Sequence, residues 1–181
     1  MNKRKKVFRE PRNASQLGQI RSSYADFTEN FAVSSSSSNG AVLFCVVGGK
    51  MSERINFSDD LGRCIVMVGL PYPNIYSPEQ KEKMTYPDAT LGPKAGQTYD
   101  EDLCMKALNQ SIGRALHHMG DCATILLLDK RYGSAKIQEN LPEWISDRLQ
   151  HHARFGPAFA AIRQFFVDKR MALPENTVLH S

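Results

Sequence analysis

Long apolar runs, a secretory signal and closely spaced cysteines are all missing from this chain of 181 residues. No apolar run approaches the roughly 20 residues that a helix needs to cross a bilayer, so we expect no membrane contact. The first residues, MNKRKKVFREP, are charged and lack the apolar stretch of a secretory signal, so none is expected. No cysteines form a Cys-x-x-Cys pair and no histidine has zinc-site spacing, so the sequence predicts no metal site.

Cysteine is sparse and lies in apolar surroundings. The four cysteines are Cys45, Cys64, Cys104 and Cys122. All but Cys104 lie in or at the ends of apolar runs, which predicts three core thiols. We expect all four to be reduced thiols of an intracellular protein. The histidine pairs at 117–118 and 151–152 are poor metal ligands, because adjacent residues of a helix point about 100° apart.

Two common phosphate-binding patterns are missing as well. Gly49-Lys50 is not part of a Walker A loop, because that pattern needs glycine at position 44, which is Phe44. A G-x-G-x-x-G fingerprint does not occur either. An unrelated α/β enzyme acting on a phosphorylated small molecule would need such a loop, so we rank this alternative last.

The composition is typical of one globular domain, with 41% hydrophobic and 23% charged residues. The net charge of +4 and the pI of about 8.9 permit a polyanionic partner but do not require one. The basic residues 1–6 match either a nuclear localisation patch or a solvated end. We expect a basic segment over residues 1–12, a folded domain over residues 13–171 and a frayed tail over residues 172–181.

Three short apolar runs, residues 41–47, 64–70 and 123–128, predict buried parallel strands, because they do not alternate with polar residues. Helical patterns separate these runs, which indicates an α/β fold with parallel crossover connections. Ligands of such sheets collect at the carboxyl ends of the strands. The predicted helices cover residues 14–31, 77–86, 99–118 and 157–171. Another helix is expected to begin at residues 141–144 and to end before Gly156-Pro157. Residues 87–98 are expected to form a loop.

The predicted helix over residues 99–118 has two chemically different sides. Its apolar side contains Met105, Leu108, Ile112, Ala115, Leu116 and Met119, and its polar side contains Gln110, Arg114, His117 and His118. Such a helix suits the presentation of hydrogen-bond donors to a phosphate. An ordinary amphipathic helix with a solvated polar face remains the alternative.

Two blocks of the sequence resemble helicase motifs. The segment QSIGRALHH (110–118), followed by an apolar strand that ends in Asp129-Lys130-Arg131-Tyr132, resembles motif VI of superfamily-two helicases. The upstream segment GGKMSERINFSDDLGR (48–63) resembles motif V, and Phe8-Arg9-Glu10-Pro11 resembles an FxEP junction. The chain is similar to the XPD-like iron–sulfur DNA helicases, and more narrowly to ChlR-type helicases of sister-chromatid cohesion. The resemblance covers about residues 6–169.

The resemblance implies a RecA-like C-terminal helicase lobe, with a parallel sheet flanked by helices, and it implies roles for single residues. By position in motifs V and VI, the DNA-binding residues are Lys50 and Ser52, the nucleotide-binding residues are Glu53, Asn56, Gln110 and Arg114, and the catalytic positions are Arg114 and His117. His117 replaces the second arginine of motif VI, and Arg54 replaces a glycine of motif V. A shorter, mostly neutral histidine is a poor arginine finger.

In the complete protein, the resemblance implies ATP hydrolysis with Mg²⁺ coupled to DNA unwinding in the nucleus. Its implied partners are DNA, an N-terminal helicase lobe, and cohesion or replication proteins. The family's iron–sulfur cluster belongs to the N-terminal half, so we do not expect these cysteines to hold it. Without Walker A and Walker B motifs, we expect the isolated chain to be inactive. The alternative is a non-catalytic truncated paralogue or a single-lobe adaptor that binds DNA or protein.

Overall fold

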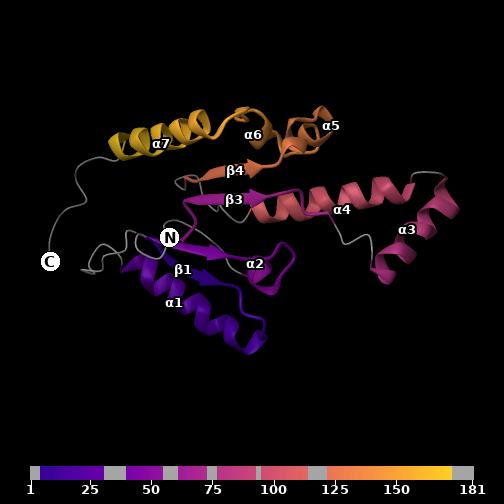
Figure 1. Cartoon of the computed structure of the whole chain (residues 1–181), viewed down its shortest axis with the longest axis horizontal. Helices are drawn as coiled ribbons and strands as arrows, with labels where there is room; N and C mark the ends of the chain where they lie inside the picture. The colour runs from indigo at the N-terminus through magenta and orange to yellow at the C-terminus, as the bar shows by residue number, and fades with distance from the viewer. Residues whose placement is uncertain are drawn as a thin grey trace. The chain divides into compact units, whose positions relative to one another are not determined.

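The computed structural model of the chain describes residues 5–30, 40–54, 61–72, 77–92, 95–113 and 122–172. The chain divides into two compact units, residues 1–142 and 143–181. The elements follow each other in this order (Figure 1): β1 (Lys6–Arg9), η1 (Ala14–Gln16), α1 (Leu17–Glu29), β2 (Ala41–Phe44), α2 (Lys50–Arg54), β3 (Cys64–Val68), α3 (Pro78–Leu91), α4 (Ala95–Ile112), β4 (Thr124–Leu128), η3 (Lys130–Gly133), α5 (Ala135–Gln138), α6 (Glu143–Ser146) and α7 (Phe155–Ala172).

Strands β1 and β2 form a parallel pair, in register from Lys6 opposite Ala41 to Arg9 opposite Phe44. Helix α1 packs against both strands. The buried ring of Phe8 on β1 meets the buried ring of Tyr24 on α1 edge to face, with 5.4 Å between ring centroids. The sequence pattern does not predict β1, which lies within the expected basic segment, because a four-residue run with two charges gives no strand signal.

Strands β3 and β4 form a second parallel pair, in register from Cys64 opposite Thr124 to Val68 opposite Leu128. The predicted strands and their parallel direction are therefore confirmed. The predicted burial on both faces is wrong for all three runs, because Val66 and Val68 on β3 are 48% and 82% exposed. Phe44 on β2 and Leu128 on β4 are 50% and 44% exposed. Apolar sequence alone cannot tell which face of a strand receives a covering helix. Within the described residues the strands form two pairs.

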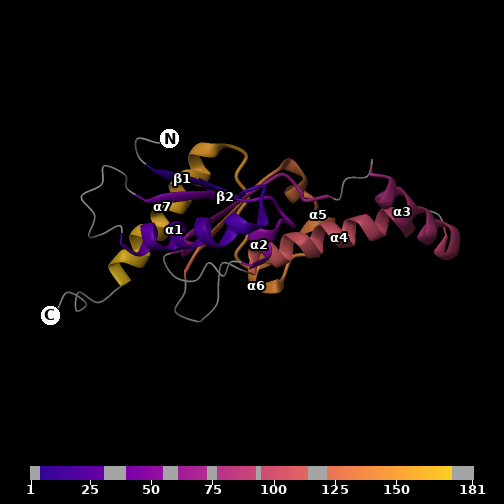
Figure 2. The same cartoon turned by 90° about the horizontal axis from the view of Figure 1, so that it is seen from below.

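Helices α3 and α4 pack against each other as consecutive helices (Figure 1 and Figure 2). The prediction that a loop begins at Pro87 is wrong, because α3 continues through this residue to Leu91 and α4 already begins at Ala95. An internal proline removes one helical hydrogen bond, and the packing of α3 on α4 offsets that loss. An oxygen of Asp88 accepts a 2.9 Å hydrogen bond from the amide of Gly96 near the start of α4.

The second unit contains α6 and α7. The prediction that the helix opening near Leu141 runs to Gly156 is wrong, because α6 ends at Ser146. Residues 150–154 are exposed and contain no large apolar side chain, so a longer helix would bury nothing there. Helix α7 then begins at Phe155 and includes Pro157 in its first turn, where a missing amide hydrogen has no cost. No helix among the described residues meets the length and apolarity needed to cross a bilayer.

The cysteine positions correct a prediction about the core. All four cysteines carry free thiols, but Cys45 and Cys64 are exposed and Cys122 is only partly buried. The fully buried thiol is Cys104, which shares the inner side of α4 with Leu108. Cys104 has helical spacing to Leu108, whereas the apolar character of the surrounding run is the only feature that predicts burial of the other three thiols.

Candidate functional site

The loop that follows β2 is held by the carboxylate of Glu10, the residue that follows β1. One oxygen of Glu10, Oε2, accepts a 2.8 Å hydrogen bond from the amide of Val46. The other, Oε1, accepts a 3.0 Å hydrogen bond from the amide of Met51. The amide of Glu10 itself donates to the carbonyl of Phe44 at 2.8 Å, which extends the β1–β2 ladder. Glu10 is therefore fixed by the strand pair and in turn fixes both ends of the loop.

Two glycines shape this loop. Gly48 has a φ of +73°, a left-handed conformation that glycine adopts without steric cost. The amide of Gly49 closes a turn by donating to the carbonyl of Val46 at 2.9 Å. A Cβ atom on Gly49 would lie 2.6 Å and 2.7 Å from the two oxygens of Glu10, so the carboxylate approaches this backbone too closely for any other residue.

The two predicted DNA-binding residues lie at the end of this loop. Lys50 is the first residue of α2 and is exposed. The hydroxyl of Ser52 donates a 2.9 Å hydrogen bond to the carbonyl of Gly49, so it stabilises the turn that carries Lys50. The next residue after Lys50, Met51, is buried. The local geometry thus anchors the chain on both sides of Lys50 and leaves its ammonium group toward solvent.

The thiol of Cys45 lies in the same loop, but its protonation argues against a nucleophilic role. Displacement of water by the surrounding chain and the charge of Glu10 together raise the pKa of Cys45 to about 11. A cysteine acts as a nucleophile in its thiolate form. At neutral pH this raised pKa keeps the Cys45 side chain in its protonated form, the weaker nucleophile.

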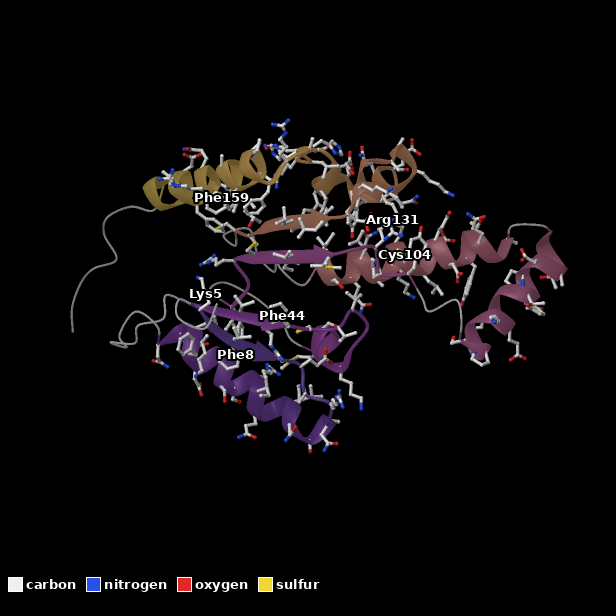
Figure 3. All side chains as sticks on the ribbon, viewed as in Figure 1. Lys5, Phe8, Phe44, Cys104, Arg131 and Phe159 are labelled. Atoms are coloured by element: carbon white, nitrogen blue, oxygen red, sulfur yellow. The ribbon has the colours of Figure 1, made fainter. Side chains whose placement is uncertain are left out.

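A second group of polar residues lies at the carboxyl ends of β3 and β4. Asp129, directly after β4, accepts hydrogen bonds from the side chain of Arg131 at 2.7 Å and 2.9 Å, and from its amide at 2.9 Å. The guanidinium of Arg131 lies 5.5 Å from the ring centroid of Tyr72, which follows β3. Arg131 and Cys104 lie at this same end of the strands (Figure 3). The pairing of β3 with β4 thus brings Tyr72, Asp129 and Arg131 together at one end of this strand pair.

A buried tyrosine strengthens the same connection. The hydroxyl of Tyr132 donates a 2.9 Å hydrogen bond to the carbonyl of Gly69, and the amide of Gly69 donates to the carbonyl of Leu128 at 3.1 Å. Burial is the main cause that raises the pKa of Tyr132 to about 12, so its hydroxyl stays a donor at neutral pH. This bond links the segment after β4 to the segment after β3.

The charges at this end are paired with each other. The guanidinium of Arg131 forms a bidentate interaction with Asp129, and the ammonium of Lys136 forms an ion pair with Glu101. Both cations already have carboxylate partners, which reduces the attraction of this end for a phosphate. We interpret these residues as a connection between β3, β4 and α4 that keeps the strand ends in place.

Helix α4 has the two sides that the sequence predicts. Leu108 and Ile112 are fully buried, and Gln110 between them is exposed. The side chain of Asn109 donates a 3.1 Å hydrogen bond to the carbonyl of Asn140, which ties α4 to the segment after α5. Gln110 therefore lies on the exposed side of a helix that packs through its opposite side.

Several predicted site residues lie outside the described residues. Asn56, Arg114 and His117 are among them, and Glu53 is described only through the backbone of α2. The roles that the resemblance implies for these residues therefore stay predictions.

The cysteines do not fit an iron–sulfur cluster. Such clusters are held by four clustered thiolates, whereas one thiol here is buried in α4, two are exposed and one is partly buried. In the described parts of the chain, no three residues among His, Cys, Asp and Glu are grouped to hold a metal ion.

Glu10 holds the loop after β2, and the sequence pattern assigns it no role. The FxEP resemblance marks the segment, but the amides that Glu10 binds come 36 and 41 residues later in the chain. Hydrogen bonds between residues so far apart in the sequence can be predicted only when the pairing of β1 with β2 is known.

Comparison with known proteins places this geometry in a family context. Residues 1–148 match the family described as the helicase C-terminal domain. The chain is 53% identical over 174 residues to "ATP-dependent DNA helicase DDX11" of Danio rerio, covering 94% of this chain and 20% of that protein. It is 43% identical over 178 residues to "ATP-dependent DNA helicase CHL1" of Scheffersomyces stipitis, covering 93% and 21%. The chain thus spans about a fifth of the length of these relatives.

Two further similarities bear on function and fold. "Putative ATP-dependent DNA helicase DDX11-like protein 8" of Homo sapiens is 49% identical over 172 residues, covering 92% of this chain and 19% of that protein. The solved structure named XPD_APO superposes with a TM-score of 0.50 at 20% identity, over 77% of this chain and 31% of that chain. The second similarity concerns the fold alone and supports the RecA-like lobe that the motifs imply.

Proposed function

The chain belongs to the helicase C-terminal domain family, and we propose that it is the C-terminal RecA-like lobe of an ATP-dependent DNA helicase. The observation that carries this proposal is the match over residues 1–148, together with relatives that are named ATP-dependent DNA helicases. In such an enzyme this lobe supplies residues that contact DNA and nucleotide, while a second lobe supplies the Walker motifs.

The DNA contact is assigned to the loop after β2. Lys50 is exposed at the start of α2 and offers a positive charge to the phosphate backbone, and Ser52 supports the turn before it. A single lysine of this kind contributes binding energy without sequence preference. The chain's mildly basic pI of about 8.9 agrees with such a partner.

The nucleotide contact is assigned to motifs V and VI. Gln110 is exposed on the packed helix α4 and would orient a phosphate oxygen or the attacking water. Arg114 would stabilise negative charge on the phosphoryl group, with Glu53 and Asn56 contributing from motif V. When ATP and Mg²⁺ are bound, the metal supplies charge neutralisation on the phosphates. That metal and the Walker residues would be held by the other lobe.

The isolated chain is expected to bind DNA without hydrolysing ATP. Its 181 residues contain no Walker A pattern to hold the phosphates. We further propose that the complete protein acts in the nucleus, with cohesion or replication proteins as further partners.

Fluorescence anisotropy with labelled single-stranded DNA tests the proposal on the purified 181-residue chain. Lys50→Ala is expected to weaken binding and to reduce the slope of log K against log salt by about 0.7, the value for one lost phosphate contact. Lys106→Ala is the matched control, because Lys106 is an exposed lysine on α4. Equal affinities for the two variants would refute the assignment of Lys50. If the purified chain hydrolyses ATP and DNA stimulates this activity, the prediction that the isolated lobe is inactive is refuted.

The departures at Arg54 and His117 favour a second candidate, a non-catalytic lobe that acts as an adaptor for DNA or for a protein partner. At both positions this chain has a different residue from the glycine of motif V and the arginine of motif VI, which the family uses near the nucleotide. Joining the chain to the N-terminal lobe of its Danio rerio relative separates the two candidates. ATP turnover above that of the N-terminal lobe alone supports the helicase lobe, and background turnover with retained DNA binding supports the adaptor.

A further inference from the structure

We propose that Glu10 is a positioning residue that fixes Lys50 in its DNA-binding orientation. The inference rests on the proposed DNA contact of Lys50, but the hydrogen bonds that carry it are independent of any ligand. Glu10 and Lys50 are far apart in the sequence, and the parallel pairing of β1 with β2 brings the residues that follow the two strands to the same end. Figure 1 shows α2, which begins at Lys50, at this end of β1 and β2.

The two oxygens of Glu10 bind the two ends of one loop. Oε2 receives the amide of Val46, the second residue after β2, and Oε1 receives the amide of Met51, the second residue of α2. The loop between them contains Gly48, Gly49 and Lys50. Two glycines make a loop flexible unless other contacts hold it. Glu10 supplies such contacts at both ends, so the loop has one defined conformation.

Only a carboxylate with the length of glutamate satisfies both ends. It has two acceptor oxygens and no hydrogen to clash with an amide donor. A glutamine would turn an NH₂ group toward one of the two amides and lose that bond. An aspartate is one methylene shorter and would not reach both. The contact of the carboxylate with Gly49, where a Cβ would lie 2.6 Å away, shows how closely the loop follows the side chain.

Lys50 lies between two residues that Glu10 constrains. Gly49, before it, packs directly on the carboxylate, and the amide of Met51, after it, is bound by Oε1. Met51 is also buried, which fixes the start of α2. The backbone of Lys50 therefore has little freedom, and its exposed side chain leaves the surface in a defined direction. Glu10 itself points at the loop, so it acts on DNA only through Lys50.

The first arm of the test is amide hydrogen exchange measured by NMR on the full chain. Glu10→Gln should raise the exchange rate of the amide of Val46, of Met51, or of both by about tenfold or more, because a charged acceptor is lost. Glu10→Asp should leave one of these amides protected, and it is the second variant if Glu10→Gln does not fold. Glu29→Gln is the matched control, since Glu29 is an exposed residue of α1. Unchanged rates in both Glu10 variants would overturn the proposal.

The second arm is a double-mutant cycle on the affinity for single-stranded DNA. If Glu10 positions Lys50, Lys50→Ala should weaken binding severalfold in the natural chain and have almost no effect in the Glu10→Gln chain. A merely structural role would lower the melting temperature but leave the effect of Lys50→Ala the same in both chains, and this outcome overturns the proposal. If Lys50→Ala has no effect in the natural chain, the proposed DNA contact fails, while the exchange rates still decide whether Glu10 holds the loop.

Discussion

A side-chain carbon on Gly49 would lie 2.6 Å from Oε1 of Glu10, so the carboxylate occupies the space that any larger residue would need. The same carbon would lie 2.8 Å from the carbonyl oxygen of Val46. We expect Gly49→Ala to lower the free energy of unfolding by about 1–3 kcal/mol, the usual cost of overpacking. Urea unfolding followed by circular dichroism measures the change.

Gly18→Ala is the matched control for that substitution. Gly18 lies in α1, and a Cβ there would meet no atom within 4 Å, so alanine should be neutral or stabilise by about 0.5–1 kcal/mol. Removing the carboxylate with Glu10→Ala should make part of the cost of Gly49→Ala disappear, because the carbonyl of Val46 still remains. Fully additive effects of Glu10→Ala and Gly49→Ala would contradict the direct contact.

The hydroxyl of Tyr132 gives a second prediction, because it makes a 2.9 Å hydrogen bond to the carbonyl of Gly69 inside the first unit. Tyr132 is 4% exposed, so water cannot replace the lost donor freely. Tyr132→Phe should reduce the free energy of unfolding by about 1–2 kcal/mol. Tyr86→Phe should change it by less than about 0.5 kcal/mol, because Tyr86 is 73% exposed. Similar urea midpoints for the two variants would show that the Tyr132 bond contributes little.

The interaction of Asp129 with Arg131 predicts a pH dependence. Hydrogen bonds from the Arg131 side chain, and then from its amide, hold the pKa of Asp129 well below its usual range. A carboxyl group with a lowered pKa stabilises the fold above its unfolded value of about 3.9, and this contribution is lost as the pH falls toward the folded value. Asp129→Asn should therefore lower the melting temperature most at pH 5–7, and the difference from the natural chain should shrink below about pH 4.

Asp102→Asn provides the comparison for that pH series, because it removes an exposed carboxylate from α4 without removing a partner of Arg131. Melting temperatures at pH 7, 5, 3 and 2 suffice. A destabilisation by Asp129→Asn that stays constant down to pH 2 would mean that the charge of Asp129 is not what matters.

Much of the fold follows from local sequence patterns. The runs that become β2, β3 and β4 are short and apolar, and the inner side of α4 repeats at helical spacing through Leu108 and Ile112, so each is predicted correctly. Strand β1 is missed because its only support is the pairing with β2. The continuation of α3 through Pro87 is missed because packing against α4 outweighs the local preference of proline.

The site is less accessible to sequence reasoning than the fold. Motif resemblance identifies Lys50 and Gln110 as candidates because a motif fixes residue types at set spacings. It assigns no role to Glu10. This residue accepts hydrogen bonds from the amides of Val46 and Met51 only because two distant segments pair as strands. Exposure of Val68 on β3 is likewise a tertiary property. A motif thus names candidate residues, whereas the contacts of each side chain follow only from the folded structure.

The last prediction concerns Arg54 and His117, the two motif positions at which this chain differs from the family. In a protein that joins the chain to the N-terminal lobe of its Danio rerio relative, we expect His117→Arg to raise ATP turnover by at least about tenfold. An arginine at such a position stabilises charge that develops during phosphoryl transfer, an effect of roughly 10³–10⁵ in related enzymes. A histidine with a pKa near about 6.5 is mostly neutral at pH 7 and is shorter.

The neighbouring residue supplies the control for this experiment. His118→Arg adds the same charge, but adjacent positions of the helix predicted over residues 99–118 point about 100° apart, so turnover should not change. Arg54→Gly should add to the gain from His117→Arg, because the family has glycine at this position and a glycine allows the closest approach of a ligand to the backbone of motif V. If His117→Arg and His118→Arg raise turnover equally, a general gain of positive charge explains the result. Position 117 would then not be an arginine-finger site.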